Sequence, residues 1–132
     1  MSIPKLELQL RTLKPEQDFS GLIHLLTEIE ETDQAGSNTS EAGLRSQFDW
    51  PNHDPSQDRW VIESPSDPGR LIAHGWLFAQ SPQRTILGGA VHPQWRRRGL
   101  GRQLLSIAIV RAQTKSARQI VAGARAKQQA GH

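Results

Sequence analysis

A short basic stretch with two glycines carries the clearest chemical signal in the sequence. Between Arg96 and Arg102, four arginines surround Gly99 and Gly101, and an apolar segment with helical spacing follows. Glycines in the first turn of a helix let a ligand approach the backbone, where the first amides lack partners within the helix. The helix dipole and the arginines add positive charge at the same end. This combination predicts a site for a phosphate or pyrophosphate group.

The three consecutive arginines of this stretch support the same interpretation. Arg96, Arg97 and Arg98 stand at the end where the helix dipole is already positive, so folding alone does not favour them. The alternative is a solvated basic turn that binds nothing. Residue types by themselves leave that alternative open.

The flanking segments predict how this stretch is held. Thr85–Val91 is an apolar run typical of a buried strand, and Pro93 takes the chain out of the strand. From Leu100 onward the apolar residues recur at helical spacing. The basic stretch is therefore predicted to be the turn between a strand and a helix.

The pattern Arg96-x-x-Gly99-x-Gly101, preceded by Val91-His92-Pro93 and followed by Leu104-Leu105, resembles a known motif. It is similar to the acyl-CoA-binding motif of the GCN5-related N-acetyltransferases, the GNAT family. The resemblance implies an acetyl-CoA-dependent N-acetyltransferase in which an amine attacks the thioester directly. It also implies acetyl-CoA as the cofactor and a small-molecule or peptide amine as the acceptor.

The resemblance also implies roles for individual residues. The backbone around Gly89 and Val91 is expected to pair with the pantetheine arm, and the amides from Arg97 to Arg102 to hold the pyrophosphate. The side chains of Arg96 and Arg98 are expected to add charge-assisted contacts. The expected cofactor-binding residues are Gly89, Val91, Arg96, Arg97, Arg98, Gly99, Leu100, Gly101 and Arg102.

The catalytic residues are less clear from the sequence. The family's general base is usually a glutamate on a central strand, but no acidic residue follows Asp67. Glu63 and His74 are the candidates, although His74 is expected at the surface, and His92 is assigned to the turn before Pro93. No metal site is expected, because the absence of cysteine excludes thiolate ligands.

The rest of the chain predicts an α/β fold with a GNAT-like mixed central sheet, in which an antiparallel meander is joined by a parallel crossover strand and helices flank the sheet. On one strand, Leu71, Ala73, Gly75 and Leu77 are expected to share a face. The expected order is a strand at 6–11, a helix from Pro15 to near Glu31, a short helix at 40–48, a loop at 49–58, strands at 59–63 and 70–79, the motif strand, its helix, and a strand at 119–123.

The length of 132 residues predicts a single domain, residues 1–132. Family members usually continue with another helix and closing strands, and often use a tyrosine as the acid; this sequence contains no tyrosine. We therefore expect a domain that lacks those elements. It would be a fragment, the N-terminal half of a tandem GNAT protein, or a shortened domain that forms a homodimer through its open sheet edge.

Charge is divided unevenly along the chain. Residues 1–67 carry 5 basic and 13 acidic residues, or −8, and residues 68–132 carry 11 basic and no acidic residues, or +11, which together give the formal +3. The phosphates of coenzyme A explain the basic half as well as a nucleic acid would. No apolar run reaches membrane length and no signal peptide is visible, so a cytoplasmic protein without a membrane partner is expected.

Three functions follow from the sequence. The first is the N-acetyltransferase; the second is a non-catalytic acyl-CoA-binding half-domain of a tandem or dimeric protein; the third is a basic nucleic-acid-binding module. The acceptor stays open among small amines, aminoglycosides, amino acids, thiol-sugar conjugates and protein N-termini.

Overall fold

The computed structural model describes residues 9–34, 40–51, 53–79, 81, 84–115 and 119–122. Within them one mixed sheet has the strand order β1-β2-β3-β4-β5, which confirms the predicted fold class. The first four strands pair antiparallel, and β5 lies parallel to β4. The strands are β1 (Gln9–Thr12), β2 (Arg59–Ser64), β3 (Asp67–Ala79), β4 (Arg84–Val91) and β5 (Gln119–Ala122).

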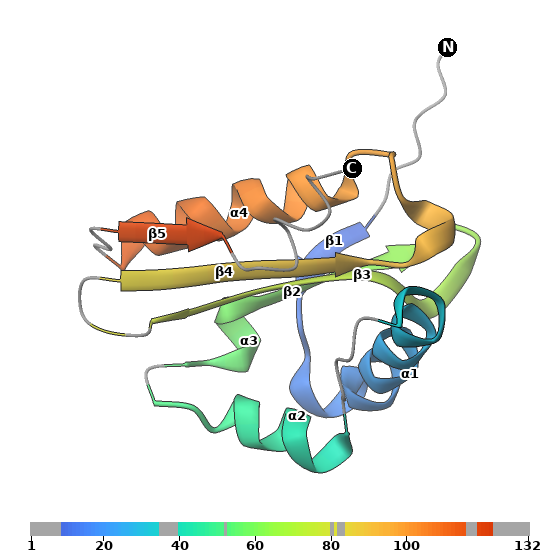
Figure 1. Cartoon of the computed structure of the whole chain (residues 1–132), viewed down its shortest axis with the longest axis horizontal. Coiled ribbons are helices and arrows are strands. Elements are labelled where there is room, and N and C mark those ends of the chain that lie inside the picture. The colour runs from blue at the N-terminus through green and yellow to red at the C-terminus, as the bar shows by residue number, and fades with distance from the viewer. Residues whose placement is uncertain are drawn as a thin grey trace.

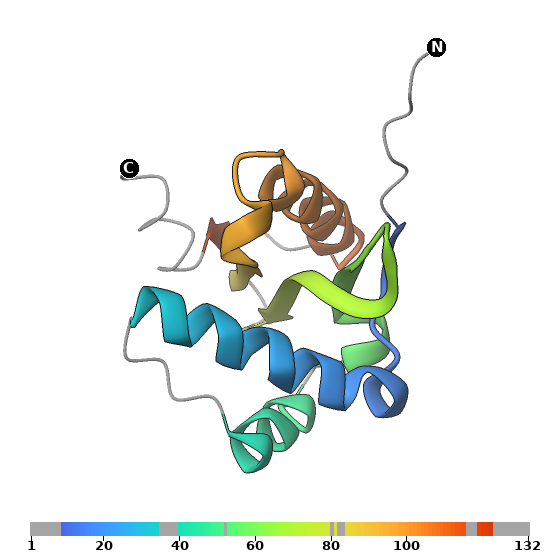
Figure 2. The same cartoon turned by 90° about the vertical axis from the view of Figure 1, so that its right-hand side faces the viewer.

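Helices cover both faces of this sheet. The helix α4 (Leu100–Thr114) lies on one face, and α1 (Pro15–Asp33) and α2 (Glu41–Phe48) lie on the other (Figure 1). The turned view shows α1 and α4 on opposite sides of the strands (Figure 2). One apolar cluster joins the sheet to α4 through residues such as Trp60, Leu77 and Leu104, and a second joins it to α1 through residues such as Phe19 and Val61. The α4 face carries the site described below.

Most of the predicted elements are present with small shifts of their ends. Pro15 begins α1 and Ser40 caps α2, where its hydroxyl accepts a hydrogen bond from the Gly43 amide at 3.0 Å. The predicted loop at 49–58 contains a short helix, α3 (Pro55–Asp58), capped by Asp54. The predicted strand residues Leu6 and Leu8, and the tail beyond Ala122, lie outside the described residues. The expected lack of closing elements stays a prediction.

A β-bulge between β2 and β3 changes which side chains share a face of the sheet. On β2, Ile62 pairs with Ala73 and the next residue, Glu63, pairs with Leu71. Ile72 is therefore the extra residue on β3. Leu71 therefore packs in the cluster on the α1 side, whereas Ala73 packs toward α4. The prediction that Leu71 shares a face with Ala73 is wrong, because simple alternation along a strand does not reveal a bulge.

The expectation that His74 lies at the surface is also wrong. His74 is only 1% exposed, on the face of β3 that also carries Trp76. Helices cover this face as well as the α4 face, so β3 is buried on both sides. In a strand that is buried on both faces, a polar residue on the face away from the apolar residues is therefore not exposed to solvent.

Position 88 requires glycine because the Trp76 side chain on β3 lies directly against its backbone. A methyl group at this position would overlap the indole ring of Trp76. We expect Gly88→Ala to lower the free energy of unfolding by about 1–3 kcal/mol, measured by urea denaturation. In Gly89→Ala, the new methyl would lie 3.4 Å from its nearest neighbour, the His74 carbonyl oxygen, so that variant should lose clearly less. An equal loss in both variants would contradict the role of Trp76.

Candidate functional site

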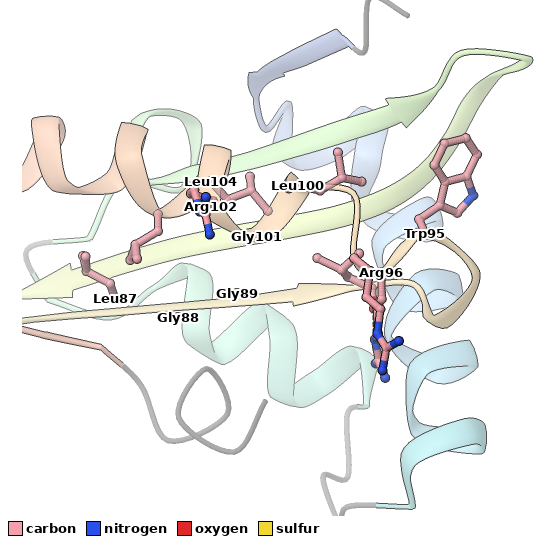
Figure 3. Close-up of a pocket in the computed structure, with 13 residues that line it drawn as sticks. Leu87, Gly88, Gly89, Trp95, Arg96, Leu100, Gly101, Arg102 and Leu104 are labelled. Carbon is pink, nitrogen blue, oxygen red and sulfur yellow. Dashed lines mark hydrogen bonds between the residues drawn. The ribbon is translucent and has the colours of Figure 1, made fainter. Parts of the chain in front are cut away.

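The end of β4 and the start of α4 enclose a groove of about 650 Å³ (Figure 3). Among the described residues, β5 pairs with β4 only from Arg84 to Leu87, and the groove begins where this pairing stops. Among the described residues, the stretch of β4 after Leu87 therefore has no strand on its β5 side. The lining residues are Leu87, Gly88, Gly89, Val91, Trp95, Arg96, Arg97, Gly99, Leu100, Gly101, Arg102, Leu104 and Leu105.

The open edge of β4 presents backbone hydrogen-bonding groups to this groove. The His92 amide donates to the Ile72 carbonyl on β3 at 2.8 Å, so His92 faces the neighbouring strand. Backbone groups alternate in direction along a strand, so the amides of Gly89 and Val91 point to the opposite edge. The Val91 carbonyl points the same way and accepts a hydrogen bond from Arg96 Nε at 3.0 Å. Among the described residues, the groups left open are therefore the amide and carbonyl of Gly89 and the amide of Val91.

The first turn of α4 continues this line of donors. Gly99 caps the helix in a left-handed conformation with a φ of 81° and has no side chain to bond the first amides. Among the described residues, the first amide with a partner inside the helix is that of Gln103, which donates to the Gly99 carbonyl at 3.1 Å. The helix starts at Leu100, where the helical spacing of the apolar residues begins in the sequence. Its first turn is therefore a set of uncapped amides at the positive end of a helix.

The four arginines of the turn have different environments. Arg96 forms a two-fold ion pair with Asp33, at 3.0 and 2.8 Å. The guanidinium of Arg98 lies 4.7 Å from the centre of the Trp95 ring. Arg97, with a φ of 66°, and Arg102 have no side-chain partner among the described residues. Arg97, Arg98 and Arg102 are thus exposed, whereas Arg96 is held by Asp33.

Glu63, a candidate base from the sequence, lies on β2 outside the groove lining. Its carboxylate accepts hydrogen bonds from Arg11 Nε at 2.9 Å and Arg11 Nη2 at 2.8 Å, and from the Gly69 amide at 3.2 Å. These bonds, those from Arg11 first, hold the pKa of Glu63 below its ordinary value. The structure places Glu63 in an ion pair that joins β1 to β2.

His74, the other candidate, pairs across the sheet with Ala90 but is buried on the face away from α4. Its Nε2 lies 3.4 Å from Arg59 Nη1, and because arginine can only donate, Nε2 accepts. Burial and then the charge of Arg59 hold the pKa of His74 well below its ordinary value. His74 is therefore a neutral side chain whose accepting nitrogen is already in use.

His92 has the structural role that the sequence assigned to it. Its Nδ1 accepts a hydrogen bond from the Gln94 amide at 3.1 Å, at the start of the short 3-10 helix Pro93–Trp95. The proton of the neutral ring then lies on Nε2, which is 3.2 Å from the Glu28 carboxylate.

Two acidic residues of α1, Glu28 and Asp33, reach the turn and were not found from the sequence. Asp33 is separated from Arg96 by 63 positions, and no spacing rule connects residues so far apart. A signal did exist in the charge pattern, because an acidic half followed by a basic half implies either a polarised surface or two halves that pair in the fold. The charge pattern does not identify which acidic residue pairs with which basic residue.

No described helix is long and apolar enough to cross a membrane. Within the same part of the chain, no three His, Cys, Asp or Glu side chains gather as they would around a metal ion.

Comparison with known proteins agrees with this geometry. The model of the acetyltransferase (GNAT) family matches residues 22–131. A GCN5-related N-acetyltransferase from Sphaerobacter thermophilus is 20% identical with a TM-score of 0.70, over 87% of this chain and 35% of that protein. This chain thus spans about a third of that protein's length. No protein with curated annotation matches the sequence.

Two further solved structures share the fold and record ligands. A GNAT family acetyltransferase from Brucella melitensis, in complex with acetyl-CoA, is 18% identical with a TM-score of 0.65, over 89% of this chain and 76% of that one. An aminoglycoside acetyltransferase from an uncultured soil metagenomic sample, in complex with sisomicin, is 14% identical with a TM-score of 0.59, over 89% of this chain and 76% of that one.

Proposed function

Because this chain belongs to the acetyltransferase (GNAT) family, we propose that it binds acetyl-CoA in the groove and transfers the acetyl group to an amine. The observation that carries the proposal is the continuous line of open backbone donors from Gly89 and Val91 on β4 to the first turn of α4. A ligand with amides at one end and a pyrophosphate at the other matches that line.

The residues of the groove fit the parts of acetyl-CoA. The carbonyl of Gly89 and the amide of Val91 would pair with the pantetheine amides as a neighbouring strand does, which leaves the Gly89 amide for the thioester. The amides of Leu100, Gly101 and Arg102 would hold the pyrophosphate, and the Arg97 side chain would add charge. A Cβ on Gly101 would have only Val91 Cγ2, at 4.0 Å, as a neighbour, so this position leaves room for a ligand.

Acetyl-CoA supplies a thioester whose acyl carbon an amine can attack directly. A C–N bond forms, the C–S bond breaks, the nitrogen loses a proton and the thiolate gains one. The chain's part is to align the thioester and to polarise its carbonyl through the backbone amide of Gly89. Neither Glu63 nor His74 lines the groove, so the proposal assigns no proton-transfer step to either.

A second candidate function is acyl-CoA binding without catalysis. It is favoured by the groove lining, which contains no acidic residue and no histidine among the described residues. Calorimetric titration with acetyl-CoA tests the shared binding step, and release of coenzyme A with a panel of amines, aminoglycosides included, separates the two functions. Binding without turnover would favour the second. Retention on nucleic acid with a steep salt dependence, and no binding of acetyl-CoA, would overturn both.

Arg97 provides a direct test of the proposed pyrophosphate site. We expect Arg97→Ala to weaken acetyl-CoA binding by about 10-fold or more, the effect of losing one charge-assisted hydrogen bond. The loss should shrink at high salt, because the contact is exposed. Arg84→Ala removes an exposed arginine at the other end of β4 and should leave the Kd unchanged. Equal Kd values for wild type and Arg97→Ala would place the phosphates elsewhere.

A further inference from the structure

We propose that Asp33, at the end of α1, is a positioning residue for the groove and acts through Arg96. The inference rests on the proposed function, because the groove that it serves is the acetyl-CoA site. It concerns how the site is held in shape, and it gives Arg96 a role other than contact with phosphate.

One guanidinium connects three parts of the fold. Arg96 Nη1 and Nη2 donate to the two carboxylate oxygens of Asp33, and Nε donates to the Val91 carbonyl. The side chains of Arg96 and Asp33 are 31% and 21% exposed, so water competes only in part for these bonds. The planar fork of arginine permits all three bonds at once, with its orientation set by the carboxylate.

This arrangement decides which groups of β4 remain for a ligand. With the Val91 carbonyl occupied by Arg96, the groups of Gly89 and the amide of Val91 stay open on that edge within the part of the chain that the structure describes. A bound pantetheine can then pair in one register only. If Asp33 were absent, the guanidinium would lose its orientation and the carbonyl would become a competing acceptor.

The same connection supports a strained turn. Arg97 adopts a positive φ of 66°, which a residue with a side chain keeps when the surrounding structure holds it there, whereas Gly99 adopts positive φ without strain. Arg96 holds the beginning of this turn to α1. His92 holds the residues just before it, through Nε2 and the Glu28 carboxylate, to the same helix.

The alternative is that Arg96 leaves Asp33 and binds phosphate directly. The two roles predict opposite signs for Asp33→Ala. If Arg96 binds phosphate, removal of Asp33 frees a cation and acetyl-CoA binds equally well or more tightly. If Asp33 positions Arg96, the same variant binds more weakly.

The test measures the Kd of acetyl-CoA by calorimetry at several salt concentrations, at a temperature where every variant is folded by circular dichroism. We expect Asp33→Ala and Arg96→Ala each to weaken binding about 10-fold, and the double variant to be no worse than either one. Arg96→Lys should be as poor as Arg96→Ala, because lysine lacks the fork. The salt dependence of Kd should stay that of wild type in all of them and become shallower only in Arg97→Ala.

Arg11→Ala is the matched structural control. It removes another ion pair to α1, the 2.7 Å contact with Asp18, without touching the groove or the turn, and it should keep the wild-type Kd. A Kd for Asp33→Ala at or below that of wild type would overturn the inference, as would full rescue by Arg96→Lys. Failure of the wild-type protein to bind acetyl-CoA would instead overturn the proposed function, so the two failures are distinct.

Discussion

Replacing Gly101 by leucine is expected to abolish acetyl-CoA binding, by at least about 100-fold in Kd, without loss of stability. Gly101 is exposed at the second position of α4 and lines the groove. A branched side chain there would occupy the space in front of the amides that are proposed to hold the pyrophosphate. Leucine is a better helix former than glycine by up to about 1 kcal/mol, so the fold should gain slightly. Calorimetry and urea denaturation measure the two effects separately.

Gln103→Leu is the control for this variant. Gln103 is exposed in the same part of α4 but does not line the groove, so the added apolar surface is similar while the site stays open. We expect its Kd to equal that of wild type. If Gly101→Leu bound acetyl-CoA as tightly as Gln103→Leu, the phosphates could not lie at the start of α4.

Replacing Asp58 by asparagine is expected to lower the free energy of unfolding by about 3 kcal/mol. Its side chain is fully buried and accepts hydrogen bonds from Arg111 Nε at 2.9 Å, from Lys115 Nζ at 3.1 Å and from the Asp54 amide at 2.9 Å. This carboxylate joins the end of α4 to the start of β2. The side chains of Arg111 and Lys115 are 30% and 27% exposed and can regain water, which places the loss near the lower end for a broken buried pair.

The pH dependence of stability should identify the Asp58 carboxylate. Burial alone would raise its pKa, but the hydrogen bonds from Asp54, Arg111 and Lys115 outweigh burial and lower the pKa below 3.8. A lowered carboxyl pKa stabilises the fold above the unfolded value and loses that effect as the pH falls through the folded one. The gap in stability between wild type and Asp58→Asn should therefore be full at neutral pH and narrow below about pH 4. A gap that does not change with pH would show that the charge is unimportant.

Two histidines should change the free energy of unfolding over a second, higher pH range in the same experiment. Burial, followed by the charge of Arg59, lowers the pKa of His53 to about 4, and the pKa of His74 is also well below 6.5. Below about pH 6.5 each histidine is therefore protonated in the unfolded chain but still neutral in the folded protein. The free energy of unfolding should consequently begin to fall as the pH drops below about 6.5. This decline is expected in wild type, and it should be at least as large in Asp58→Asn, because the Asp58 carboxylate lies 3.9 Å from His53 Nδ1 and raises the pKa of His53.

The sequence by itself determined the local framework of the groove. Pro93 ends a strand, Gly99 supplies the positive φ of a helix cap, and Leu100 begins an apolar stripe that packs on the sheet. These effects depend on sterics and periodicity within a few residues, so they can be read without the fold. The same holds for α1, which begins at Pro15 as predicted.

Only the tertiary structure decided which arginine of the turn is held by another element of the fold. All of them are equivalent in the sequence, but Arg96 is bound by Asp33 from a distant helix. Likewise, His74 is buried because a second layer covers its face, and Leu71 changes sides because of a bulge. Charge pairing, burial and register depend on contacts between residues far apart in the chain. Local pattern fixes where a turn forms, but long-range packing fixes what each of its side chains can do.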